Sequence, residues 1–194
     1  MSHPGENLRA SLAAGLIAAA VLLSGCVSQP ASALDLEGRR CDPVAEAPGS
    51  ATVLVFVSDD CPIANRYVPE LLRLRDAYVG RGVSFWLVHA DRRETVAQIR
   101  EHAREFHLTI PEVRDPAHYL VKLARAEVTP CAAAFTRDGR LVYHGRIDDR
   151  IADLQRERPT PTRRDLAEAL DAVLAGRAVP NAVTPAVGCS IPDL

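Results

Sequence analysis

The sequence has no large excess of basic over acidic residues, or of acidic over basic ones. Its 194 residues include 23 Lys and Arg against 25 Asp and Glu, which gives a formal net charge of −2 at pH 7. Surfaces that bind the phosphate backbone of nucleic acids are strongly basic, so this composition argues against a nucleic-acid partner. The five cysteines also lack the paired Cys-x-x-Cys spacing of a structural zinc site. We therefore expect neither a bound metal nor another cofactor.

The chain also lacks an apolar run long enough to span a membrane, which takes roughly 20 residues. The apolar residues 10–24 have the length of the hydrophobic segment of a signal peptide. They end in Leu23-Ser24-Gly25-Cys26, which resembles the bacterial lipobox, where the cysteine is lipidated and becomes the N-terminus. We predict a signal peptide over residues 1–25 and lipidation of Cys26. An ordinary secretory signal with an incidental cysteine is the alternative.

Lipidation would anchor the protein to a membrane of the cell envelope, facing the periplasm. Val27 follows Cys26 in place of Asp, which favours the outer membrane. Residues 26–49 are rich in Pro, Ala, Ser and Gly, so we interpret them as a tether that includes a short edge element at residues 34–40. Residues 50–177 are then expected to form one domain, and the Pro-containing residues 178–194 an extended tail.

The hydrophobic pattern predicts strands and helices in alternation, followed by a hairpin. Residues 52–57 and 83–88 are apolar runs rich in β-branched or aromatic residues, typical of strands buried on both faces of a parallel sheet. Asp138-Gly139 between two apolar runs is a hairpin signal. The predicted order is strand 52–57, helix 61–79, strand 83–88, helix 96–106, short helix 115–124, strands 131–136 and 141–146, and a helix that ends before Gly176.

Two helix starts are predicted from capping signals. Asp115-Pro116 has the pattern of an N-cap followed by proline at the first helical position. Thr162 with Asp165 resembles a capping box. The whole order predicts an α/β fold, with a central mixed β-sheet built from a βαβ half and a β-hairpin, and helices flanking it.

Cys61 is the leading candidate for chemistry. It stands between the first predicted strand and the first predicted helix, next to Pro62. A helix N-terminus presents unpaired N–H groups and a partial positive charge, which favour thiolate over thiol. Asp59 and Asp60 oppose this effect, because nearby carboxylates disfavour a further negative charge. A capping or packing cysteine is the alternative.

Thr129-Pro130 is the second candidate feature, since it stands directly before a predicted strand. With Cys61-Pro62 and the predicted element order, it resembles the thioredoxin superfamily, and most closely the redoxin group of peroxiredoxin-like and TlpA-like proteins. The segment from Phe56 to Asn65 resembles the "CPISN" variety of that group, as do Tyr143 to Asp149 and Gly188 to Ile191. The resemblance implies a thioredoxin-like fold and a cis proline at Pro130 beside the active cysteine.

The chain departs from the dithiol and copper-binding members of that superfamily. Thioredoxins and TlpA-type reductases have Cys-x-x-Cys, but Ala64 holds the place of the second cysteine. Copper chaperones of the Sco type have Cys-x-x-x-Cys and a distal His, but Asn65 holds that second place. A soft two-thiolate copper site is therefore absent. We interpret His89 and His144 as polar strand-end or surface residues.

The chain also departs from peroxiredoxins, which have Pro-x-x-x-Thr-x-x-Cys. Leu54 replaces the Pro, while Ser58 stands in for the Thr. Peroxiredoxins place an Arg near the reactive thiolate, at about the position where this chain has Thr129-Pro130. Arg146 is the candidate substitute for that Arg.

A resolving partner for Cys61 must come from elsewhere in the chain. Cys131 follows Pro130, but strand alternation is expected to turn it away from the pocket that Pro130 faces. Cys189 lies on the tail, which could fold back, and it is the preferred partner. It could instead pair with Cys41, and the sequence does not choose among the pairings.

These features lead to two hypotheses. The first is a thiol-based redox protein in which Cys61 attacks a disulfide or a peroxide, Thr129-Pro130 shapes the substrate groove, and Cys189 or an external thiol reductant resolves the product. The second is a non-enzymatic thioredoxin-fold lipoprotein that binds an envelope partner or a metal.

Overall fold

The computed structural model describes residues 32–194; the predicted signal peptide, Cys26 and the first part of the predicted tether lie outside the described residues. Within residues 32–194, no helix is both long enough and apolar enough to cross a membrane. The helices are α1 (Pro62–Val79), α2 (Val96–Glu105), α3 (Tyr119–Ala124) and α4 (Asp165–Leu174). The strands are β1 (Ala33–Asp35), β2 (Arg40–Cys41), β3 (Ala51–Val57), β4 (Val83–His89), β5 (Glu112–Arg114), β6 (Val128–Thr129), β7 (Cys131–Thr136), β8 (Leu141–Gly145), β9 (Ile151–Asp153), β10 (Arg156–Glu157) and β11 (Cys189–Ser190).

A mixed sheet of seven strands forms the centre of the fold, in the order β2-β1-β5-β4-β3-β7-β8. β3 pairs parallel with β4, and β4 pairs parallel with β5. β7 runs antiparallel to both β3 and β8. The βαβ half and the hairpin predicted from the sequence are therefore confirmed, together with the α/β fold class. β5 was not predicted, because it is only three residues long and buries only Val113 fully.

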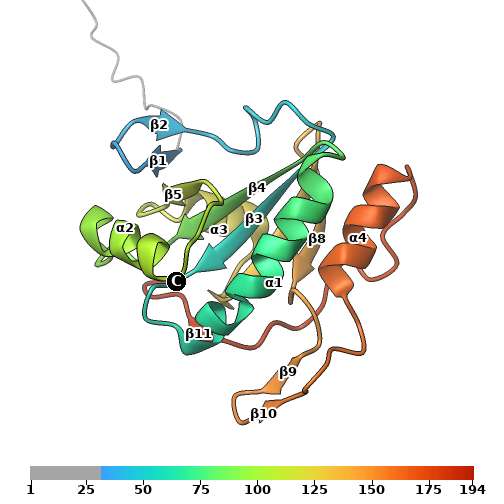
Figure 1. Cartoon of the computed structure of the whole chain (residues 1–194). Helices are drawn as coiled ribbons and strands as arrows, with labels where there is room; N and C mark the ends of the chain where they lie inside the picture. Colours follow the sequence, from blue (N-terminus) through green and yellow to red (C-terminus); the bar gives the residue numbers. More distant parts are fainter. Residues whose placement is uncertain (1–31) are drawn as a thin grey trace, which may run out of the picture. The chain divides into compact units, whose positions relative to one another are not determined.

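β3 is buried along its whole length because helices cover both faces of the sheet (Figure 1). Successive side chains of a strand point to opposite faces. Val53, Val55 and Val57 belong to one core cluster with the apolar faces of α1 and α4. Leu54 and Phe56 belong to the other, with α3. This two-sided burial accounts for the unbroken apolar run in the sequence.

The N-terminal part of the described chain contributes two edge strands to the sheet, where the sequence predicts a short edge element at residues 34–40. β1 pairs antiparallel with β5 and with β2, and Val44 is buried in the second core cluster. The folded unit therefore begins near Ala33 and not at Ser50. The physical reason is that β5 would otherwise leave an open sheet edge, which β1 and β2 cover.

Two capping predictions need correction. α3 begins at Tyr119 with His118 as its N-cap, three residues later than expected, although the Asp115 carboxylate still accepts hydrogen bonds from the amides of Tyr119 and Val121. α4 has no capping box. The Thr162 side chain and amide donate to Asp149 instead, and the helix begins after Arg164.

The C-terminal tail contains no helix and attaches to the domain at two places. Near Thr184 it contacts β8: the amide of Thr184 donates to His144 O (3.1 Å), and its hydroxyl contacts the Tyr143 hydroxyl (2.7 Å). Further along, β11 pairs antiparallel with β6, with Cys189 opposite Thr129 and Ser190 opposite Val128. The tail thus returns to the end of the sheet where β3 leads into α1 (Figure 1).

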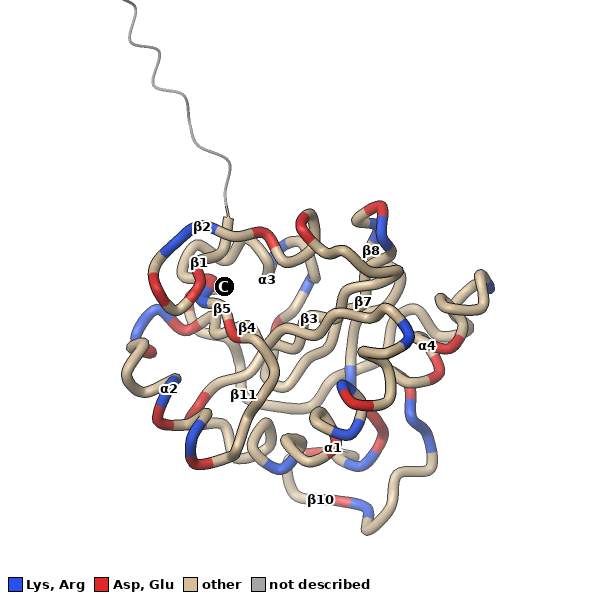
Figure 2. The backbone as a smooth tube through the Cα atoms, turned by 45° about the horizontal axis from the view of Figure 1, so that its top comes forward, with Lys and Arg blue, Asp and Glu red and all other residues tan. Residues whose placement is uncertain are grey.

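The central strands β3, β4 and β7 carry no Lys, Arg, Asp or Glu; these residues lie on the helices, the loops and the short outer strands (Figure 2). Acidic and basic residues alternate around the fold, and most of the arginines form ion pairs with nearby carboxylates. Examples are Arg66 with Glu157, Arg81 with Asp171 and Arg163 with Glu168.

Candidate functional site

Cys61 occupies the turn from the central strand into α1. It is the N-cap of α1, with φ −83° and ψ 106°, and Pro62 takes the first helical turn as expected. Its side chain is fully buried, and its sulfur meets partners from other elements of the fold.

Two segments far along the chain meet Cys61. The Thr129–Pro130 peptide bond is cis, as the sequence resemblance implies, and Cys61 Sγ lies 3.1 Å from Thr129 O. The Cys189 Sγ lies 2.9 Å from the Cys61 Sγ. All four cysteines of the described chain are free thiols. The fold thus brings two of the predicted site residues, Thr129 and Cys189, into contact with Cys61, and Pro130 follows Thr129 directly.

The two thiols have opposite pKa shifts. Burial raises the pKa of Cys61, but hydrogen bonds from the Cys189 thiol and the Ala64 backbone amide favour the thiolate, and the net pKa lies below the ordinary value. Burial and the hydrogen bond to Cys61 raise the pKa of Cys189 to about 11. Cys61 is therefore the more readily ionised of the two thiols and the better nucleophile.

The other two cysteines lie away from this pair. Cys131 faces the second core cluster, whereas Cys61 belongs to the first, so the alternation predicted for the strand is confirmed. Burial raises the pKa of Cys131 to about 11. The pKa of Cys41 is also raised to about 11 by burial and by the charge of Glu46. Both thiols are protonated at neutral pH, which makes them poor nucleophiles.

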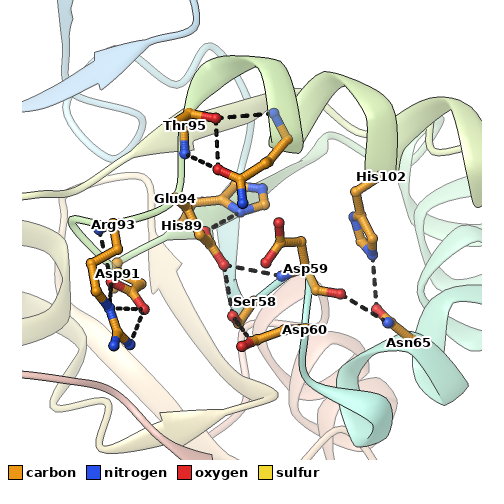
Figure 3. Close-up of polar contacts among 12 residues, drawn as sticks. Ser58, Asp59, Asp60, Asn65, His89, Asp91, Arg93, Glu94, Thr95 and His102 are labelled. Atoms are coloured by element: carbon orange, nitrogen blue, oxygen red, sulfur yellow. Dashed lines mark hydrogen bonds and ion pairs between the residues drawn. The ribbon is translucent and has the colours of Figure 1, made fainter.

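A buried polar network holds the loop that precedes Cys61 (Figure 3). Ser58 Oγ lies 2.6 Å from both Asp60 Oδ1 and Glu94 Oε1, and the amide of Asp59 donates to Glu94 Oε1 (3.0 Å). His89 Nδ1 lies 2.9 Å from Glu94 Oε2. Ser58 therefore bonds to carboxylates and not to the Cys61 sulfur.

Glu94 and His89 were not identified as site residues from the sequence. Glu94 stands 33 positions beyond Cys61 in an otherwise charged segment, and no local motif marks it. His89 ends β4, as expected of a strand-end residue, but it is buried and not on the surface. The side-chain contacts that couple both residues to the Cys61 loop are visible only in three dimensions.

Arg146, the candidate for the arginine that peroxiredoxins place near the reactive thiolate, bonds to other groups. Its Nε donates to Asp165 Oδ2 (2.8 Å), and its amide donates to Thr184 Oγ1 (3.1 Å). It thus ties α4 and the tail to the end of β8. His144 is half-buried beside the tail, and burial with the charge of Arg125 lowers its pKa.

The described residues include one group with the composition of a hard-cation site, formed by Asp59, Asp60 and Glu94, whose ligand atoms lie within 4.8 Å of one another. Burial and the negative charge of Glu94 raise the pKa of Asp59. Hydrogen bonds and charge from His89 outweigh burial and lower the pKa of Glu94. Oxygens of the cluster accept hydrogen bonds from the Ser58 hydroxyl and the Asp59 amide.

A cleft of about 170 Å³ opens beside the tail cysteine. It is lined by Ser58, Asp60, Arg93, Thr129 and Cys189, among others. Cys189 is partly exposed, whereas Cys61 is 0% exposed. An external group can therefore approach the Cys189 side of the pair while Cys61 stays covered.

Neither a protein-family model nor a curated protein matches the sequence. Among solved structures, an uncharacterised conserved protein from Geobacillus kaustophilus is similar, with 28% identity and a TM-score of 0.69, over 85% of this chain and 90% of that one. A hypothetical protein from Sinorhizobium meliloti 1021 has 25% identity and a TM-score of 0.70, over 83% of this chain and 91% of that one.

A third similar structure has a described activity. It is a secreted disulfide oxidoreductase of Mycobacterium tuberculosis, homologous to DsbE of E. coli. It has 19% identity and a TM-score of 0.51, over 75% of this chain and 94% of that one. This chain has a thioredoxin-like fold. In that fold, Cys61 stands at the start of the helix that follows the central strand, with the cis Thr129–Pro130 bond beside it.

Proposed function

We propose that this protein is a thiol-disulfide oxidoreductase of the cell envelope, in which Cys61 and Cys189 form the redox-active pair. The observation that carries the proposal is their Sγ–Sγ distance of 2.9 Å together with opposite pKa shifts. A thiolate next to a protonated thiol is the arrangement that disulfide exchange requires, because one sulfur attacks and the other resolves. Cys189 thereby supplies the second, resolving thiol, which in Cys-x-x-Cys proteins stands at the position of Ala64.

The reaction proceeds by two exchanges. The Cys61 thiolate attacks one sulfur of a protein disulfide, which forms a mixed disulfide and releases the first substrate sulfur as a thiolate that takes up a proton. Cys189 then loses its proton and attacks Cys61 Sγ, which forms the Cys61–Cys189 disulfide and releases the second substrate sulfur. The substrate gains two electrons and two protons, and an external thiol reductant returns the pair to the dithiol state.

Disulfides are favoured over peroxides by the bonding of the two auxiliary candidates. The Ser58 hydroxyl contacts Asp60 and Glu94, and the Arg146 guanidinium pairs with Asp165. Neither the Ser58 hydroxyl nor the Arg146 guanidinium bonds to Cys61. A group that stabilised a bound peroxide would have to lie beside that sulfur. Thr129 and Pro130 border the Cys61–Cys189 pair and would shape the groove for the substrate.

The proposed location follows from the N-terminal sequence. The lipobox-like Leu23-Ser24-Gly25-Cys26 supports export and lipidation of Cys26, which would hold the domain on the periplasmic side of a membrane, with the outer membrane preferred. An exported site also fits the chemistry, because disulfides persist outside the cytoplasm. Radiolabelled palmitate incorporation that Cys26→Ser abolishes would support the anchor, and unchanged incorporation would contradict it.

The test of the function is reduction of a protein disulfide such as that of insulin, with dithiothreitol as the external reductant. We expect Cys61→Ser to lose all catalysis and Cys189→Ser to accumulate a mixed disulfide at Cys61, detected by intact mass. Cys131→Ser is the matched control and should retain full turnover. Full turnover by Cys61→Ser, or a sulfenate at Cys61 under peroxide without any disulfide exchange, would contradict the proposal.

A further inference from the structure

Cys61 is inaccessible in the folded chain. It is 0% exposed, and its sulfur contacts Thr129 O and the Cys189 sulfur. Attack on another protein's disulfide therefore requires a covering segment to move. β3 and α1 belong to the core of the domain, whereas Cys189 is only partly buried and packs against that core.

The tail is built so that its last part can open while the rest stays attached. Thr184 is buried and is held by Tyr143, His144 and Arg146. β11 pairs with β6 alone, so one of its edges has no strand partner. Residues 185–187 join the two attachments. Separation of β11 from β6 would break a few backbone hydrogen bonds and expose Ile191, and it would leave the attachment at Thr184 intact.

Departure of β11 would uncover both Cys61 and a free strand edge. The backbone groups of β6 that now pair with the tail would need a new partner, and so would Glu127 O, which accepts from the Ile191 amide at 3.0 Å. An exposed edge of this kind is satisfied by an extended peptide that adds a strand. A bound segment in the same register would place a cysteine opposite Thr129, with its sulfur beside Cys61.

The tail's own register defines what such a segment must look like. A Cβ added at Gly188 would lie 2.0 Å from Thr129 O, so the residue before the cysteine must be glycine. Ile191 is 4% exposed and packs in the second core cluster, so the second residue after the cysteine must be aliphatic. Ser190 between them is exposed and leaves that position open.

We propose that β6 is a binding site for an extended substrate segment of the pattern Gly-Cys-x-aliphatic, and that the tail strand β11 occupies this site as an internal mimic that the substrate displaces. This inference rests on the proposed function. It adds the class of substrate and a mechanism of product release. After the mixed disulfide has formed at Cys61, β11 returns to β6, and its Cys189 resolves the bond while its backbone expels the reduced segment.

Binding can be measured without any redox step. The fluorescently labelled peptide Ala-Val-Gly-Ser-Ser-Ile-Pro copies residues 186–192 with serine in place of cysteine, so that it binds without a covalent bond. The protein is the full mature chain carrying Gly188→Ala, in which the added Cβ would collide with Thr129 O and displace β11. Gly80→Ala is the matched control, because a Cβ there has nothing within 4 Å.

We expect the peptide to bind the Gly188→Ala variant at least about tenfold more tightly than the wild type or the Gly80→Ala control, since the tail no longer occupies the site. Peptides with valine in place of glycine, or aspartate in place of isoleucine, should not bind. In the same variant, iodoacetamide should modify Cys61 at least about tenfold faster, because removal of the cover raises the fraction of accessible protein.

Two results would overturn the inference. One is a Gly188→Ala variant whose Cys61 stays protected, which would show that the tail does not move. The other is an accessible Cys61 without binding of the peptide, which would show that β6 accepts no segment. Ile191→Asn provides a second tail-releasing variant if Gly188→Ala does not fold.

Failure of the proposed function would give a different pattern. In that case the peptide would bind and Cys61 would become accessible, yet neither the wild type nor the Gly80→Ala control would reduce the disulfide-linked dimer of the peptide Ala-Val-Gly-Cys-Ser-Ile-Pro. Conversely, reduction of insulin by the wild type without binding of the peptide by the tail-released variants would leave the function standing and would remove the β6 site.

Discussion

At the scale of single residues, the reactivity of Cys61 depends on a hydrogen-bond donor that the sequence places 128 positions away. Burial opposes the ionisation of Cys61. The Ala64 amide, at the start of α1, supplies part of the compensation that a helix N-terminus is expected to give. The Cys189 thiol supplies more, so the tail is part of the electrostatics of the site.

This dependence can be tested by two substitutions of the tail cysteine. The pKa of Cys61 should be higher in Cys189→Ala than in Cys189→Ser, because a serine hydroxyl still donates to the thiolate and a methyl group does not. The ultraviolet absorbance of the thiolate, followed against pH, measures the difference. Equal Cys61 pKa values in both variants would show that Cys189 does not act as a donor.

Glu94 is the residue whose loss should disturb the loop before Cys61. Glu94→Ala removes the acceptor for Ser58 and the Asp59 amide and leaves the buried His89 ring without its partner. We expect the free energy of unfolding to fall by about 3 kcal/mol, which is the cost of removing one partner of a buried ion pair and leaving the other. Glu94→Gln retains an acceptor oxygen and should lose less in the same urea titration; equal losses would contradict this assignment.

At the scale of secondary-structure elements, helix starts depend on which carboxylate or hydroxyl reaches the free amides. Thr95 and Gln98 form a complete capping box at α2, whereas the similar pair Thr162 and Asp165 does not at α4. Asp149 engages Thr162, and Arg146 engages Asp165. A similar local pattern thus forms a capping box at α2 and none at α4, because residues distant in sequence bind the side chains of Thr162 and Asp165.

Asp115 should stabilise α3 although it lies outside the helix. Its two carboxylate oxygens accept from the amides of Tyr119 and Val121 at 2.8 and 2.9 Å. Asp115→Ala should lower the free energy of unfolding by about 1–2 kcal/mol, as for the loss of an N-cap. Asp115→Asn retains one of the two acceptors and should lose less. Urea unfolding of both variants measures this, and no loss in Asp115→Ala would refute the role.

At the scale of the whole molecule, oxidation should lock the tail to the domain. A Cys61–Cys189 disulfide would close a loop that spans 128 positions, most of the described chain. The loss of unfolded-state entropy predicts a gain of up to about 5 kcal/mol in the free energy of unfolding. Thermal unfolding of the oxidised and reduced protein compares the two states. The Cys189→Ser variant should show no gain, and a gain there would point to a different disulfide.

Alkaline pH should destabilise the reduced protein through its buried thiols. The pKa of Cys131 rises from an ordinary 9.0 to about 11 in the fold. Below about pH 9 the thiol is protonated in both states, so its full contribution to stability is present; as pH rises toward 11 only the unfolded state ionises, and up to about 3 kcal/mol is lost. Urea titrations at pH 8 and 10.5 measure the loss. Cys131→Ala should show a smaller difference, and an unchanged difference would exclude Cys131 as its source.

Much of the fold was predictable because its signals are local or periodic. The apolar run around Val55, the helix that begins at Pro62 and the hairpin at Asp138-Gly139 were all placed within a few residues of where they lie. The edge element predicted at residues 34–40 corresponds to β1 and β2, whereas β5 was not predicted, because a strand of three residues carries little periodic signal.

By itself, the sequence determined that Cys61 ends a buried strand and starts a helix, that no second cysteine stands at Ala64, and that Cys131 faces away. These follow from hydrophobic periodicity and strand alternation, which act over a few residues. Only the tertiary structure decided that Cys189 meets Cys61, that Glu94 holds the preceding loop and that Arg146 bonds elsewhere. Such contacts join residues far apart in sequence, and they depend on how strands and tail pack, which no local pattern encodes.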